Sequence, residues 1–380
     1  MTGAAHGLAA RIPLAGGSGH LRLRPTPQAA AAPFPAWRSA VTVHTLEGSA
    51  ALEWLENRWP ALYEADPMAT PFTSPGWLLG WARQLPAAAT VLLLLAVGPA
   101  GVSAGLALLR EDGDAGTELR ALSPYCEYVT PVGPGAQDMR TADALASRLA
   151  ECVQAGALVT LANVPAGSPL ATALRTQDDW QHTLSRTAAV PLPLDLCALP
   201  KSARRQHLRR EQALAAAAGT VTFHRTRTAA ELLAALPALE TLHTAQRGTA
   251  THSPVPGAWA KALGPCADGA FIAEARIDGA VMAAQLCLQR GRRCYSVLPA
   301  MDPARSHLSP GHALLRWLTH DLAVDGITCL DLGPTRETAG QLHYKAQYGP
   351  VWNVNASFTA GRNVPGPSLT RTSLAKGSAA

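Results

Sequence analysis

The residues best suited to chemistry lie together between Cys294 and Leu318, in the stretch CYSVLPAMDPARSHLSPGHALLRWL. The pattern predicts a strand broken near Pro299, a polar loop, and a helix that opens at 309–311. Serine can cap a helix, proline suits its first turn, and glycine lets a ligand approach the backbone. The free N–H groups and the dipole of a helix start favour an anion. The stretch therefore predicts a site for a phosphate-bearing ligand.

Other candidate groups are less specific. Asp331 ends the next predicted strand, where its carboxylate could orient or deprotonate an amine, although capping of the turn at Gly333 is an equal alternative. None of the 12 histidines has an HxxxH or HxH partner, and the seven cysteines show no CxxC or Cys/His ligand spacing. We therefore predict reduced thiols and no metal site. His312 has the best position of the histidines, one residue after Gly311.

The composition indicates a globular protein with flexible ends. The 380 residues exceed the size of a usual single core, so two domains are expected. Hydrophobic residues make up 48% and charged residues 16%, with a formal net charge of +5, too mild for a dedicated nucleic-acid binder. The longest apolar run, Val91–Val97, is too short to cross a bilayer. We predict a cytoplasmic protein without a membrane segment.

Hydrophobic periodicity and turn residues predict an α/β fold with a mixed sheet. Both halves give the same order of elements, a strand, helices, a hairpin, a strand, a helix and a strand, which suggests an internal duplication. The expected strands are 41–46, 91–97, 102–109, 158–161, 180–194, 221–224, 271–276, 281–288, 294–301, 330–333 and 351–358, with a further extended segment at 119–132. The expected helices are 50–63, 74–84, 141–155, 201–218, 229–246, 258–263, 310–324 and 341–348, with a kink or break at Pro237.

The predicted helix that opens the second half is basic. Its first ten residues, KSARRQHLRR from Lys201, contain five lysines and arginines. A solvated helix face is the ordinary interpretation of such a run, and RNA binding is the alternative. No aromatic residues are interleaved to stack on bases. The run alone does not decide between them.

Six motifs occur in an order that resembles the GNAT acyltransferase superfamily, in particular CelD/BcsL-like acetyltransferases with FemX-type tandem domains. They are PFTSPGW from Pro71, YCEY from Tyr125, the basic run from Lys201, the turn Asp278-Gly279, the junction Tyr295 to Gly311, and YKAQYG from Tyr344. The resemblance implies two GNAT-like domains, at 39–198 and 199–362. The segments outside them, 1–38 and 363–380, are expected to be disordered tails, the first because it is rich in Ala, Gly and Pro and has no periodicity.

The resemblance also implies a donor, acyl-CoA and in particular acetyl-CoA, held where the strand before the phosphate-binding turn separates from its neighbour. The backbone beside Leu298 and Ala300 would face the thioester, where an N–H could stabilise the oxyanion. Arg305 opens the phosphate-binding turn. The amides of Ser309, Gly311, His312 and Ala313 would hold the pyrophosphate.

For the acyl acceptor, the resemblance implies a small-molecule amine that attacks directly, without a nucleophilic Ser or Cys. Asp331 could then take its proton, Tyr344 could protonate the thiolate, and Lys345 could pair with phosphate. Glu127 and Tyr128 of the first half could reach the acceptor.

Two other functions stay open at this point. FemX-type relatives use aminoacyl-tRNA, so the basic helix is compatible with tRNA as donor and amide formation as the reaction. A non-catalytic GNAT-like binding protein is the other possibility, because no residue is an unambiguous acid or base. The sequence does not specify the acceptor or the oligomeric state.

Overall fold

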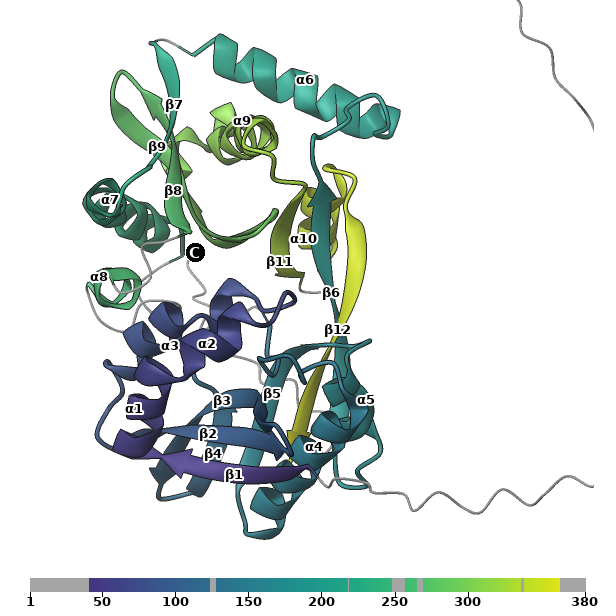
Figure 1. Ribbon diagram of the computed structural model, residues 1–380. Helices are drawn as coiled ribbons and strands as arrows, with labels where there is room; N and C mark the ends of the chain where they lie inside the picture. The colour runs from purple at the N-terminus through teal and green to yellow at the C-terminus, as the bar shows by residue number, and fades with distance from the viewer. Residues whose placement is uncertain are drawn as a thin grey trace, which may run out of the picture. The chain divides into compact units, whose positions relative to one another are not determined.

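The computed structural model describes residues 41–123, 128–217, 219–247, 257–264, 269–335 and 338–362. Within these residues the strands form one 12-stranded mixed sheet, in the order β1-β2-β3-β4-β5-β12-β6-β11-β10-β9-β8-β7 (Figure 1). The strands are β1 (Thr42–Glu47), β2 (Ala89–Gly98), β3 (Gly101–Gly113), β4 (Gly116–Ala121), β5 (Leu158–Pro165), β6 (Gln181–Pro191), β7 (Val221–Arg225), β8 (Ala270–Ile277), β9 (Ala280–Arg290), β10 (Arg293–Met301), β11 (Cys329–Thr335) and β12 (Val351–Ala360).

The helices agree closely with the periodicity of the sequence. They are α1 (Gly48–Asn57), α2 (Trp59–Glu64), α3 (Pro75–Ala82), α4 (Met139–Gln154), α5 (Pro169–Arg175), α6 (Lys201–Ala215), α7 (Ala229–Arg247), α8 (Ala258–Leu263), α9 (Pro310–Val324) and α10 (Ala339–Ala346), with 3-10 turns η1 (Pro71–Thr73) and η3 (Pro303–Leu308). Ser74 caps α3 by accepting from the Trp77 amide, as its position before Pro75 predicts. None of the described helices has the length and apolar character that crossing a bilayer requires.

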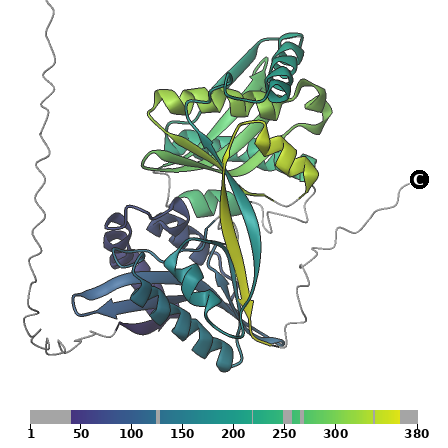
Figure 2. The ribbon, with the colours of Figure 1, turned by 90° about the vertical axis from the view of Figure 1, so that its right-hand side faces the viewer.

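The sheet repeats one arrangement twice. Strands β1 to β5 lie in chain order, and β7 to β11 lie in chain order from the other edge. In each set the last two strands pair in parallel, β4 with β5 and β10 with β11. The sixth strands are exchanged, since β12 pairs with β5 and β6 pairs with β11, and the two also pair with each other (Figure 2). This supports the expected duplication, whereas the predicted domain boundary at 198/199 stays a prediction.

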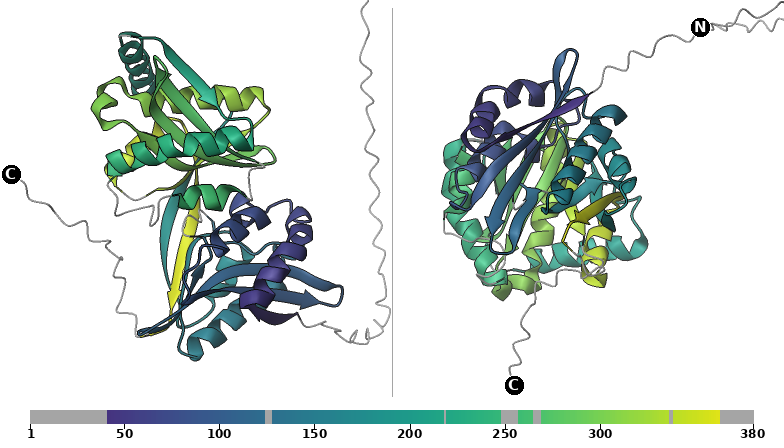
Figure 3. Two further views of the ribbon diagram at one scale, coloured as in Figure 1. Left: turned by 90° about the vertical axis from the view of Figure 1, so that its left-hand side faces the viewer. Right: turned by 90° about the horizontal axis from the view of Figure 1, so that it is seen from below.

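Helices cover both faces of the second set of strands (Figure 3). On one face α7 packs on β8, β9 and β10, and on the other α9 packs on the same strands. The stripe of α9 comprises Leu314, Leu315, Leu318 and Leu322, all buried as predicted. Full burial of each leucine contributes about 1.5–3 kcal/mol. The burial of this stripe fixes the start of α9 against β10.

Three local predictions differ from the structure. α7 continues through Pro237 without a break. The carbonyl that would have bonded a residue-237 amide belongs to Leu233, which is exposed, so water can satisfy it. β10 is not broken at Pro299 but continues against β9 to Met301, with a bulge at Val297. The extended segment expected at 119–132 is a strand only to Ala121; residues 124–127 of it lie outside the described part.

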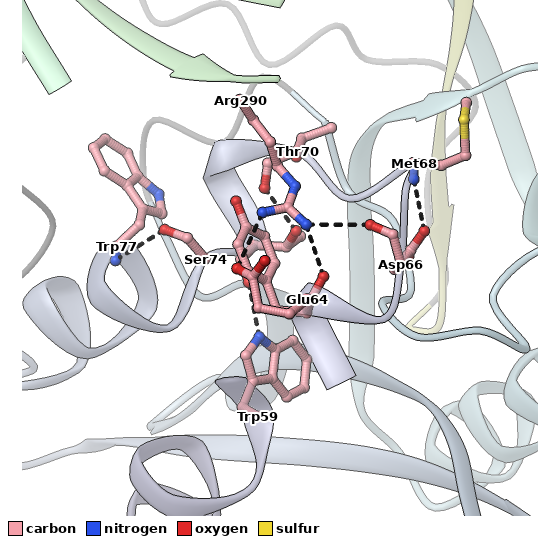
Figure 4. A network of polar contacts seen from close by, with 10 residues as sticks. Trp59, Glu64, Asp66, Met68, Thr70, Ser74, Trp77 and Arg290 are labelled. Carbon is pink, nitrogen blue, oxygen red and sulfur yellow. Dashed lines mark hydrogen bonds and ion pairs between the residues drawn. The ribbon is translucent and has the colours of Figure 1, made fainter. Parts of the chain in front are cut away.

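Arg290 of β9 links the second half to the first (Figure 4). Its guanidinium stacks on Tyr63 at 3.7 Å from the ring centre and donates to the carbonyls of Tyr63 (2.9 Å) and Asp66 (3.3 Å). It also pairs with Glu64 at 3.3 Å. Arginine suits this position because its planar fork can stack and donate at the same time.

The backbones of α3 and α8 touch at Gly80, where a Cβ atom would lie 2.1 Å from the Ala262 carbonyl oxygen. We expect Gly80→Ala to lower the free energy of unfolding by about 1–3 kcal/mol, because overpacking outweighs the higher helix propensity of alanine. Chemical denaturation measures this. Gly167→Ala, where a Cβ meets no atom within 4 Å, is the control and should change stability by less than about 0.5 kcal/mol. A Gly80→Ala protein as stable as the control would contradict the close contact.

Candidate active site

The junction between β10 and α9 is built by an unusual turn. Ser309 adopts the left-handed conformation (φ 52°, ψ 46°), and Pro310 occupies the first helical position, as its residue type predicts. Ser309 stands at the N-cap position, but its side chain makes no cap hydrogen bond, contrary to the prediction. An N-cap side chain reaches the helix amides from extended backbone, which the left-handed turn does not provide.

Next to this junction β10 and β11 separate. They pair in parallel only through Arg293–Tyr295 and Cys329–Asp331, although β10 continues to Met301 and β11 to Thr335. The separation predicted from the family resemblance is therefore present. Its vertex lies at Tyr295 and Asp331.

A cavity of about 330 Å³ lies along the free part of β10. It is bounded by β9, β10, the end of α7 and the first turns of α9 and α10. Its lining residues are Gln246, Ala284, Gln285, Pro299, Ala300, Met301, Gly311, His312, Leu314, Gly340, Gln341 and Tyr344. Four of the predicted site residues, Ala300, Gly311, His312 and Tyr344, meet here.

The amide groups at the start of α9 are mostly engaged. The Ser309 amide donates to Ser306 O (3.0 Å), and those of His312 and Ala313 donate to Ser309 O (3.1 and 3.2 Å). Of the four amides predicted to hold pyrophosphate, that of Gly311 alone has no acceptor among the described residues. The left-handed Ser309 tightens the first turn, so its carbonyl takes two donors. An anion here would meet one free amide and the helix dipole.

His312 lies in a polar cluster beneath the cavity. Its Nδ1 accepts from Arg210 (3.0 Å) and from the Tyr348 hydroxyl (2.7 Å). Burial, followed by the Arg210 charge, lowers the pKa of His312 to about 3. The imidazole is therefore neutral at pH 7, and since Nδ1 accepts, Nε2 carries the proton. Burial also raises the pKa of Tyr344 to about 12, so this cavity-lining phenol stays protonated at neutral pH.

Lys345 does not line the cavity. Its buried Nζ donates to the carbonyls of Gly333 (2.7 Å) and Pro334 (2.8 Å) on β11. This position differs from the predicted pairing with phosphate, because buried carbonyls hold the ammonium. Lys345 instead ties α10 to the strand that leaves β10.

Asp331 and Tyr128 are brought together from the two halves of the chain. The Tyr128 hydroxyl donates to Asp331 Oδ2 (2.5 Å), the Gly333 amide donates to Oδ1 (2.9 Å), and Arg293 lies 3.8 Å away. Both predicted roles of the carboxylate are thus compatible with its position, since one oxygen caps the turn. Burial raises the pKa of Asp331, although these three neighbours act in the opposite direction. Glu127, predicted beside Tyr128, lies outside the described residues.

The remaining predicted residues lie around the cavity or apart from it. Leu298 is buried next to the bulge at Val297, whose extra residue is left out of the ladder to β9. Arg305 pairs with Asp302 at 3.6 Å and lines a separate hollow of about 460 Å³ beside α6. The structure therefore does not bring Arg305 to the cavity.

Three residues of the site were missed from the sequence. Gln285 sits within a predicted apolar strand, Arg210 within the basic helix, and Tyr348 at a helix end. For Gln285 the signal was a polar residue inside an apolar strand, which marks a buried group that needs a partner. The basic run around Arg210 gave no such signal. No three or more His, Cys, Asp or Glu side chains group to hold a metal ion within the described ranges.

Comparison with known proteins identifies a family and a fold that include this geometry. The family model described as "Acetyltransferase (GNAT) domain" matches residues 202–346. No curated protein matches the chain. Three solved structures share the fold at low identity: FemX (12% identity, 84% of this chain and 98% of that chain, TM-score 0.58), L-PGS from Bacillus licheniformis (15%, 83% and 93%, 0.53), and a conserved protein of unknown function from Bacteroides thetaiotaomicron (12%, 82% and 97%, 0.53).

The family match over residues 202–346 indicates an enzyme that transfers acyl groups. Residues 202–346 match the GNAT acetyltransferase family, and the described chain shares its overall fold with FemX.

The low pKa of His312 gives a prediction for stability. Because the folded pKa of about 3 lies below the ordinary 6.5, the unfolded chain binds a proton that the folded chain does not, and stability falls as the pH drops below about 6.5. Between pH 6.5 and 5, protonation of this group in the unfolded chain should lower the free energy of unfolding by about 2 kcal/mol. We expect the free energy of unfolding of His312→Gln, measured by urea denaturation at pH 6.5 and pH 5, to fall by about 2 kcal/mol less than that of the wild type. His320→Gln, on the exposed side of α9, is the control, and equal slopes for both variants would contradict the assignment.

Proposed function

We propose that the protein is an N-acyltransferase that moves an acyl group, in particular acetyl, from acyl-CoA to an amine of a small molecule in a ternary complex. The observation that carries this proposal is the cavity along the free part of β10, at the separation of β10 from β11 and beside the start of α9. A long donor could pass through this gap with its thioester near β10 and its phosphates towards Gly311.

The described residues provide more suitable contacts for the amide-bearing arm and the thioester of such a donor than for its pyrophosphate. The lining of the cavity is uncharged at neutral pH, since His312 and Tyr344 are both neutral, and this suits the amide-bearing arm of CoA. The bulge leaves Val297 out of the ladder between β10 and β9, so its backbone N–H could meet the thioester oxygen. Among the described residues, only the Gly311 amide and the dipole of α9 would bind the pyrophosphate, which is few groups for a doubly charged part of the ligand.

Proton transfer in this proposal uses two groups on opposite faces of the sheet. The amine attacks the thioester carbonyl carbon, the C–S bond breaks, and the amine proton passes to Asp331. The Tyr344 phenol, which lines the cavity, protonates the leaving thiolate. By strand alternation Asp331 faces away from α9, since its neighbours Leu330 and Leu332 pack in the α9 core. The acceptor would thus arrive from the side of Tyr128.

Binding of acetyl-CoA to the full chain tests the proposal. We expect isothermal titration calorimetry to give one site with a dissociation constant in the micromolar range, and saturating ligand to raise the melting temperature. Binding should weaken as salt increases, because the phosphates meet a helix dipole. The absence of heat and of a thermal shift with acetyl-CoA, and with longer acyl-CoAs, would refute the CoA donor.

Asp331→Asn tests the base. Asparagine has the same shape, and its Oδ1 can still accept from the Gly333 amide while its Nδ2 can donate to the Tyr128 hydroxyl oxygen. We therefore expect a folded protein whose kcat falls about a hundredfold or more, measured as thiol release from acetyl-CoA with a panel of primary amines. Tyr128→Phe removes a hydrogen bond that lowers the pKa of Asp331, so the acidic limb of kcat/KM should move to higher pH. Tyr63→Phe, which leaves the three neighbours of Asp331 in place, is the control. An unchanged limb in Tyr128→Phe would argue against Asp331 as the base.

A second candidate keeps the fold and takes aminoacyl-tRNA as donor. The exposed arginines of α6, Arg204, Arg205 and Arg209, favour it, as does the likeness to FemX, which concerns the fold alone. Filter binding distinguishes the donors: retention of tRNA that falls steeply with salt, and is lost in the triple arginine-to-serine variant, would support this candidate. Retention unaffected by the three substitutions would remove the role of α6.

A further inference from the structure

Gln285 is a buried polar residue at the centre of the second half of the sheet. On β9 it lies opposite Ala273 of β8 and Pro299 of β10. Its side chain is 4% exposed and lines the cavity. Its Nε2 has no hydrogen-bond partner among the described residues. A buried amide donor therefore faces the space in which we place the acyl donor.

Other buried amides of the protein show how unusual this is. Asn355 donates from Nδ2 to the Thr187 hydroxyl (2.5 Å), and Gln347 donates from Nε2 to the His343 carbonyl (3.1 Å). Leaving a buried donor unsatisfied costs free energy, and replacing it with an apolar group of the same shape can stabilise a protein. A ligand acceptor in the cavity would remove the cost at Gln285.

The cavity defines the acceptor chemistry. The strand position opposite Gln285 is Pro299, which has no N–H, and the Met301 amide already donates to the side chain of Gln246 (3.2 Å). Backbone donors are thus scarce on this wall. No lining residue carries a charge at neutral pH, so an anionic group would be poorly compensated here, whereas a neutral carbonyl oxygen fits the amide N–H.

We propose that Gln285 is a donor-binding residue whose Nε2 donates a hydrogen bond to a carbonyl oxygen of the neutral arm of bound acyl-CoA. The inference rests on the proposed function and adds a specific contact to it. The oxygen belongs either to the acyl thioester or to an amide of the pantetheine arm. Free CoA has the second but not the first, so comparing the two ligands separates these sources.

The test uses Gln285→Met in the full chain, with Gln289→Met as its match. Gln289 lies on the same strand four residues on and outside the cavity lining. Titration calorimetry with CoA and with acetyl-CoA, and the melting temperature of the ligand-free protein, are measured for all three proteins. A residue that merely supports the core would lower the melting temperature when replaced.

We expect Gln285→Met to bind acetyl-CoA about five- to tenfold more weakly, as loss of one hydrogen bond predicts, and to melt roughly 2 °C higher without ligand. Weakening for acetyl-CoA alone assigns the contact to the thioester, and equal weakening for CoA assigns it to the pantetheine arm. Gln289→Met should match wild type.

Two results would overturn the inference in distinguishable ways. If wild type binds acetyl-CoA and Gln285→Met binds it equally well, or melts lower without ligand, the contact is wrong while the CoA donor stands. If wild type binds neither CoA nor acetyl-CoA, the proposed function fails and the inference fails with it.

Discussion

The separation of two parallel strands is the constraint on which the site depends. β10 and β11 share three residue pairs and then part, so backbone groups that a sheet would satisfy face each other across a gap. Two side chains replace the lost partners. The Gln246 side chain accepts a hydrogen bond from the Met301 amide of β10, and Lys345 donates to the carbonyls of Gly333 and Pro334 of β11. The gap is thus stabilised as a feature of the folded protein.

The exchange of β6 and β12 holds this gap in place. β11 leaves β10 but stays paired with β6, and β6 pairs along its length with β12, which joins β5 of the first half. The strand that bends away is therefore anchored to both halves of the sheet. On the other side, α9 is fixed by its buried leucines, and β10 is fixed against β9. Movement of the gap would require disruption of one of these ladders.

Sequence reasoning succeeded where a local pattern determined the structure. Helix α9 begins at Pro310, and the Asp278-Gly279 turn connects β8 and β9, because proline and glycine restrict or permit particular backbone angles. It failed where a residue far away in the sequence determines the position or protonation state of a side chain. The carbonyls that hold Lys345 and the two donors to His312 Nδ1 come from other elements, as Tyr128 does for Asp331. No spacing in the chain reveals such contacts, and the left-handed backbone of Ser309 overrode its capping preference.

The two faces of the sheet near the gap differ in a way that bears on the proposed reaction. Asp331 lies at the vertex on the side of Tyr128, where burial raises its pKa, while the neutral His312 and Tyr344 lie on the side of α9. The proposed base and the proposed acid are thus kept apart by the strands. If the thioester lies in the gap, the amine loses its proton on one face and the thiolate gains one on the other. In the proposed reaction each proton therefore has its own group from the start, which suits direct transfer without a covalent enzyme intermediate.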